Sequence, residues 1–154
     1  MRKLLILIPL VFFAPSVFAQ LEMGIGLEPN FTFIWNQPIG QTAGSLTYDF
    51  GTVAVESTTK FGVMGDIMLA TSLGVCYDIP LNGARVIRLS TGPLISFGLM
   101  AEGMYYGGYF QAKYKNDSAS SWYANTGFDF YYFMDEGRII LPTIYIGGGY
   151  SFEF

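Results

Sequence analysis

Apolar and polar residues alternate with a period of two along most of this chain. The last eight residues, GGGYSFEF, carry the pattern clearly, because Tyr150, Phe152 and Phe154 fall on one face of an extended strand and small or acidic residues fall on the other. A soluble domain commonly ends in a polar, frayed tail. The sequence instead predicts a strand that reaches Phe154, with three aromatic side chains to accommodate on one side.

The same alternation recurs in six other segments. The seven predicted strands span residues 20–35, 45–56, 60–79, 84–102, 104–115, 121–134 and 138–154. Each is at least twice the length of about 5–6 residues that is commonest in soluble proteins, and roughly 9–11 residues suffice to cross a bilayer. A change of phase near Gly51 predicts a β-bulge, and Asn82-Gly83 predicts a tight turn.

The two faces of these strands differ in the size of their residues as well as in their polarity. One face carries large apolar side chains, and the other is rich in Gly, Ala and Ser. In a soluble sandwich or barrel the apolar face would form the core, and alternation alone does not separate that case from a membrane barrel. The strand lengths, and small residues suited to a narrow, filled lumen, favour strands whose apolar face meets lipid.

The first 19 residues have the layout of a secretory signal peptide. Arg2 and Lys3 precede an apolar stretch over residues 4–14, and Val17-Phe18-Ala19 forms a small-residue cleavage site. We expect cleavage after Ala19, which leaves residues 20–154 as a single domain. All 12 acidic residues but only 6 of the 8 basic residues lie in that part, so its formal charge of −6 argues against a nucleic-acid partner.

The C-terminal GYSFEF resembles the last strand of bacterial outer-membrane β-barrels, which typically ends in an aromatic residue preceded by apolar residues at alternating positions. The length and the signal-plus-barrel layout resemble the small OmpA/OmpX-type family of eight-stranded barrels. This resemblance implies an all-β, closed, antiparallel up-and-down transmembrane barrel in the outer membrane, with both termini in the periplasm. It also implies two partners, outer-membrane lipid and the barrel assembly machinery, which would read Tyr150, Phe152 and Phe154 as an assembly signal.

The strand count and the loops do not follow directly from the sequence. Only seven segments are marked, so eight strands require either that one long segment hides a turn or that residues 45–56 belong to a long outer loop. The polar stretches 36–44 (NQPIGQTAG) and 116–121 (NDSASS) are predicted as the obvious loops.

Charged residues on the predicted inner face form a candidate polar network in the lumen. Its predicted members are Glu22, Glu28, Asp66, Asp78, Arg88, Glu102, Lys113 and Asp129. Buried charges must be paired or hydrated. Because an eight-stranded lumen is only just wide enough for side chains, we favour a network that rigidifies the barrel over an acidic, cation-preferring passage.

The sequence offers little catalytic chemistry. It contains no histidine, so a serine nucleophile would lack its usual base and no zinc-type cluster can form. We therefore expect no catalytic residues, no metal and no cofactor, and a non-enzymatic barrel with a structural or surface-interaction role. Two alternatives remain: a narrow cation-preferring pore or small-ligand conduit, and a soluble exported barrel that binds a ligand.

Overall fold

The computed structural model describes most of the chain after the predicted signal peptide. The described residues are 20–28, 30–32, 38–50, 53–64, 66–98, 104–116, 120–132 and 140–154. The predicted signal peptide, Gly51 and Glu102 lie outside them. In the described part of the chain, no helix is both long and apolar enough to cross a membrane.

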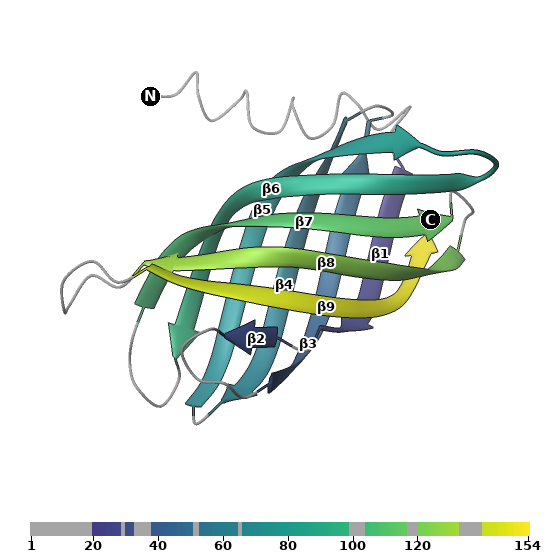
Figure 1. The fold of residues 1–154 in the computed structure, drawn as a ribbon. Helices are drawn as coiled ribbons and strands as arrows, with labels where there is room; N and C mark the ends of the chain where they lie inside the picture. Colours follow the sequence, from purple (N-terminus) through teal and green to yellow (C-terminus); the bar gives the residue numbers. More distant parts are fainter. Residues whose placement is uncertain are drawn as a thin grey trace, which may run out of the picture.

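The chain forms a single antiparallel sheet that closes into a barrel (Figure 1). Its elements are β1 (Gln20–Leu27), β2 (Asn30–Thr32), β3 (Pro38–Asp49), β4 (Val53–Met64), β5 (Asp66–Pro80), β6 (Arg85–Gly98), β7 (Met104–Asn116), β8 (Ser120–Tyr132) and β9 (Ile140–Glu153). Because β1 and the short β2 both pair with β3 on one side and β9 on the other, they form one strand of the barrel. The predicted closed, eight-stranded, all-β barrel is confirmed.

The first and last strands close the sheet. The β1–β9 register runs from Glu22↔Glu153 to Leu27↔Gly148. Beyond it, the amide of Phe154 donates a hydrogen bond of 2.9 Å to the carbonyl of Leu21. The last residue therefore pairs with the start of β1, and the start of β1 and the end of β9 lie at the same end of the barrel.

Two of the predicted strands each contain a reversal of the chain. Asp49 pairs with Ala54, and the amide of Phe50 donates a 3.0 Å hydrogen bond to the carbonyl of Val53, so β3 and β4 form a hairpin. The prediction of a bulge near Gly51 is therefore wrong. The shift in the alternation comes from the hairpin, since a hairpin turn can change the phase of the pattern as a bulge does. The predicted segment 60–79 likewise joins the end of β4 to β5, with a reversal between Met64 and Asp66.

The predicted loops also need correction. Residues 38–44 of the first polar stretch are strand residues of β3, since they pair with β1, β2 and β4. In the second stretch, Asn116 ends β7 and Ser120 begins β8, which leaves only 117–119 between them, outside the described residues.

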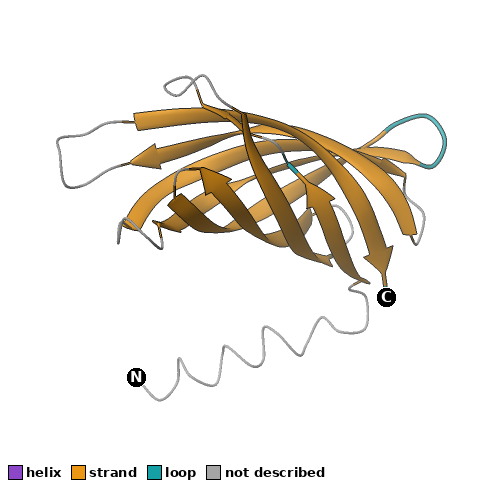
Figure 2. Cartoon of the chain, turned by 90° about the horizontal axis from the view of Figure 1, so that it is seen from below, coloured by secondary structure: helices purple, strands orange, loops and turns teal. Residues whose placement is uncertain are grey.

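The predicted Asn82-Gly83 turn is confirmed, and it is the teal loop of Figure 2. Gly83 has a φ of 80°, a backbone conformation that residues with a Cβ atom rarely adopt. The amide of Leu81 donates a 2.8 Å hydrogen bond to the carbonyl of Arg85, which closes the turn.

The polarity of the barrel is inverted relative to a soluble protein. Exposed and buried residues alternate along β8 from Ser120 to Tyr131. Among the described residues, 19 buried side chains are polar or charged and only 10 are hydrophobic, while large apolar side chains such as Leu27, Leu73 and Ile146 are more than half exposed. The predicted assignment of the two faces is confirmed, and this outer surface is suited to lipid.

Large side chains also enter the lumen, although the sequence pattern indicated mainly small ones. Tyr109 and Tyr145 are buried there, and each lies against a glycine. A Cβ atom added at Gly74 would overlap the Tyr109 hydroxyl, and one added at Gly127 would overlap the Tyr145 ring. The glycines of the inner face therefore make room for tyrosine rings from other strands.

Candidate functional site

The lumen holds eight buried charged side chains among the described residues. Four are acidic and four are basic: Glu22, Glu28, Glu56, Asp129, Lys60, Arg88, Lys113 and Lys115. Each of the four cations lies within salt-bridge distance of at least one carboxylate. The buried charges therefore balance in number and are paired, as burial requires.

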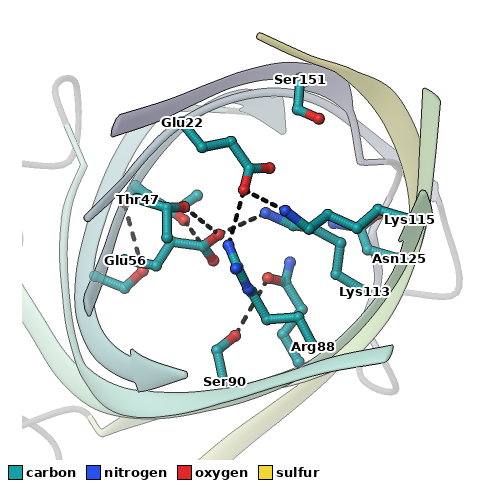
Figure 3. Close-up of polar contacts among 12 residues, drawn as sticks. Glu22, Thr47, Glu56, Arg88, Ser90, Lys113, Lys115, Asn125 and Ser151 are labelled. Atoms are coloured by element: carbon teal, nitrogen blue, oxygen red, sulfur yellow. Dashed lines mark hydrogen bonds and ion pairs between the residues drawn. The ribbon is translucent and has the colours of Figure 1, made fainter. Parts of the chain in front are cut away.

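Arg88 of β6 gathers three carboxylates from three other strands. Its Nε and Nη2 donate to the two carboxylate oxygens of Asp78 at 2.7 Å each. Its Nη1 donates to Glu22 at 2.9 Å and its Nη2 to Asp49 at 2.7 Å. The Lys115 ammonium also binds Glu22 (Figure 3). The planar, multidentate guanidinium suits this arrangement, which links β1, β3 and β5 to β6.

Glu56 of β4 is the centre of a second cluster. Its carboxylate accepts hydrogen bonds from Thr47 at 3.1 Å and Thr58 at 3.4 Å. The Lys113 ammonium of β7 reaches across the lumen to the same carboxylate (Figure 3). Lys113 also lies 5.0 Å from the centre of the Tyr123 ring. Glu56 is thus fully satisfied without access to solvent.

Lys60, also on β4, is the centre of a third cluster. Its ammonium lies 3.0 Å from Asp129 and 3.2 Å from Glu28. The Tyr145 ring lies beneath it, 3.5 Å from ammonium to ring centre, in a cation–π contact. The Tyr131 hydroxyl donates to Asp129 at 3.4 Å. Lys60 therefore joins β8, β9 and the residue after β1 to β4.

Amide side chains and an apolar group fill further space beside these ion pairs. The Asn125 and Gln111 amides donate to the same oxygen of Glu28. Ala70, Leu94 and Tyr131 form a small buried hydrophobic cluster. The lumen is thus occupied by side chains of both kinds.

The structure places most of the predicted network residues in these clusters. Glu22, Asp78 and Arg88 meet in the first cluster, and Lys113 belongs to the second. Glu28 and Asp129 share Lys60 in the third. The side chains of Asp66 and Glu102 lie outside the described residues.

Four network residues were not predicted from the sequence. They are Asp49, Glu56, Lys60 and Lys115. The signal for two of them was present, because Glu56, Thr58 and Lys60 alternate along one face of β4. This alternation indicates an inner face only when residues 53–64 form one continuous strand, and the predicted strands divided them between two segments.

The predicted C-terminal signal lies at the rim of the barrel. Phe152 and Phe154 are exposed, at 40% and 74%, and Tyr150 is partly exposed. The ring of Tyr150 packs edge to face against Trp122 at 5.2 Å and against Phe152 at 4.9 Å. Trp122, Tyr150 and Phe152 thus form a continuous outer patch on β8 and β9.

The geometry shows no metal centre in the described part of the chain, where no group of three or more His, Cys, Asp or Glu residues could hold an ion. The only cysteine of the sequence, Cys76, is free and buried. The carboxylates of the lumen are instead paired with lysine and arginine side chains of the same chain.

Comparison with known proteins identifies the fold. No family model and no curated protein matches the sequence. Three solved structures are similar to the chain. They are the N-terminal β-barrel domain of Pseudomonas aeruginosa OprF (TM-score 0.60, 16% identity, 88% of this chain and 97% of that chain), Neisserial surface protein A (0.61, 8%, 88% and 97%) and Pseudomonas aeruginosa OprG (0.57, 11%, 88% and 95%). The chain therefore has the fold of the eight-stranded outer-membrane β-barrels.

Proposed function

We propose that this protein is a non-enzymatic outer-membrane β-barrel with a structural or surface-interaction role. The observation that carries the proposal is the inverted polarity of the barrel: large apolar side chains outside and paired charges inside. In water, such an outer surface would be a large exposed apolar area. In lipid, it is the surface that a barrel needs.

The proposed location is the bacterial outer membrane, after cleavage of a signal peptide at Ala19. The start of β1 and the end of β9 lie at the same end of the barrel, which supports termini on the same side of the membrane. We place that end in the periplasm, as the resemblance implies. The proposed partners are the surrounding lipid and the machinery that inserts barrels.

The burial and pairing of the lumen carboxylates argue against catalysis. Among the described residues, the hydroxyl groups that donate to carboxylates in the lumen belong to Thr47, Thr58 and Tyr131, and their carboxylate partners are paired with lysine. Glu56 and Asp129 are completely buried, so a substrate could not approach them without opening the barrel. This arrangement supports a structural role for the network.

The same packing argues against a pore. Lys113 and Lys60 each extend to a carboxylate on a distant strand, so two ammonium groups and their partners occupy the lumen. An ion would have to displace these pairs in order to pass. A narrow cation-preferring pore remains the alternative that the next experiment addresses.

The test combines cell fractionation with conductance. We expect the protein to pellet with outer membranes, and the purified protein to give no steady conductance in planar lipid bilayers. Recovery in the soluble periplasm would contradict the proposed location. Stable cation-selective steps that disappear in the Glu56→Gln variant would replace the structural role with the pore.

A structural role for the network predicts a large effect of Arg88→Gln. The change removes the ion pairs of Arg88 with Glu22, Asp49 and Asp78, while Glu22 keeps its pair with Lys115, so the free energy of unfolding in lipid vesicles should fall by about 3–5 kcal/mol. Arg85→Gln is the matched control, because Arg85 begins the same strand and is exposed. Equal, small effects of both changes in denaturant titrations would show that the pairs contribute nothing to stability.

The proposed assembly signal predicts that Phe154→Ser separates insertion in cells from stability. The Phe154 side chain is 74% exposed and the variant keeps the backbone hydrogen bond to Leu21, so refolding into detergent should be nearly unchanged. Insertion in cells should fall sharply and leave unfolded protein in the periplasm. Phe50→Ser, which removes an exposed aromatic residue at the β3–β4 turn, should insert normally. Normal insertion of Phe154→Ser would mean that the terminal aromatic residue is not read as a signal.

A further inference from the structure

The charges that enter the lumen are segregated along the chain. On β1 to β5 and the residue after β1, the described inward charges are five acidic residues and one lysine: Glu22, Glu28, Asp49, Glu56, Asp78 and Lys60. We call this the acidic wall. On β6 and β7 the described inward charges are all basic: Arg88, Lys113 and Lys115. We call β6 and β7 the basic hairpin.

The ion pairs of the basic hairpin all run to the acidic wall. Arg88 binds Glu22, Asp49 and Asp78. Lys113 binds Glu56 and Lys115 binds Glu22, both on strands that lie across the lumen from β7 (Figure 3). Among the described residues, no ion pair joins the hairpin to β8 or β9.

The sequence carries the same bias. Residues 20–80 contain six acidic residues and one basic residue, for a formal charge of −5. Residues 85–116 contain four basic residues and one acidic residue, for a formal charge of +3. The segregation is therefore a property of two long stretches of chain on either side of the Asn82-Gly83 turn.

Pairing in the finished barrel does not require segregation. A buried carboxylate and ammonium satisfy each other whichever strand carries which charge. Segregation has a consequence only before the barrel closes, while the acidic wall and the basic hairpin are still apart. A concave surface lined by one sign of charge then focuses an electric field that extends over a Debye length of roughly 8–10 Å. That field attracts an oppositely charged segment and repels a surface of the same sign.

We propose that the segregated charge is a recognition device that guides barrel closure. The acidic wall recruits the basic hairpin of the same chain, and it disfavours assembly with the acidic wall of a second copy. The inference concerns how the barrel assembles and does not depend on the function proposed above.

The test compares two variants of one ion pair. The exchanged variant, Glu56→Lys with Lys113→Glu, again places opposite charges at the two positions but lowers the segregation, since the formal charge of the wall changes from −4 to −2 and that of the hairpin from +3 to +1. The neutral variant, Glu56→Gln with Lys113→Gln, removes the pair but keeps more segregation, because the wall has a formal charge of −3 and the hairpin one of +2. If segregation guides closure, the neutral variant refolds faster than the exchanged variant. If only the pair matters, the exchanged variant refolds at least as fast as the neutral one.

The measurement is the rate of refolding from urea into uncharged detergent micelles at low salt, followed by the gel shift between heated and unheated protein. We expect the wild type to refold fastest and the exchanged variant about tenfold more slowly than the wild type. We also expect the exchanged variant to form more oligomer. An exchanged variant that refolds at least as fast as the neutral one would overturn the proposal.

A salt series on the wild type keeps the proposal testable if the exchanged variant does not fold. Raising KCl to about 0.5 M shortens the Debye length and should slow refolding of the wild type, with a smaller effect on the neutral variant. A wild-type rate that does not change with salt would equally overturn the proposal.

Discussion

The hydrogen-bonded seam between β1 and β9 holds the barrel closed. It removes the sheet edge that an open barrel would expose to lipid, where unpaired backbone groups cost several kcal/mol each. The seam also fixes the register, from Glu22↔Glu153 to Leu27↔Gly148. A slip by one residue would turn Glu22 toward the outside and break its contacts with Arg88 and Lys115. The register that closes the barrel is therefore also the register that places the charged side chains in its interior.

Closure makes a charged interior tolerable because each cation reaches carboxylates on other strands. Lys60 and Arg88 each lie within ion-pair distance of more than one carboxylate. A well-packed apolar lumen of the same volume could be equally stable, so the pairs are not required for stability as such. They do specify which strands face one another, since removing one partner leaves a buried charge unpaired. The tyrosines packed against inner-face glycines occupy much of the remaining space.

The alternation of residues predicted the strands and their two faces, but it could not predict which charged side chains pair across the lumen. Alternation alone gave the two faces, and Asn82-Gly83 gave its turn. The reversal between Met64 and Asp66 leaves no mark in the sequence pattern. Gly62 before it and Ala70 after it are both buried and both at even positions, so the alternation continues through the turn without a change of phase. The β3–β4 reversal does shift the phase and was therefore mistaken for a bulge.

The partners across the lumen had no local signal of any kind. Lys113 is 57 residues from Glu56, and Lys115 is 93 residues from Glu22. Nothing in the spacing of these residues reveals which carboxylate each lysine will reach. Their pairing follows from the strand order and from the closure of the sheet, both of which are properties of the whole chain.

We conclude that the outer face of this barrel meets lipid. The most direct measurement is spin-label accessibility on β8 in lipid vesicles, with single cysteines introduced at Trp122, Thr126 and Phe130 in a Cys76→Ser background. These three positions are all exposed, and Thr126 lies midway along the strand. Our account predicts that access to oxygen relative to a water-soluble nickel complex is highest at Thr126 and lower toward Trp122. Equal and high access of the nickel complex at all three positions would contradict it.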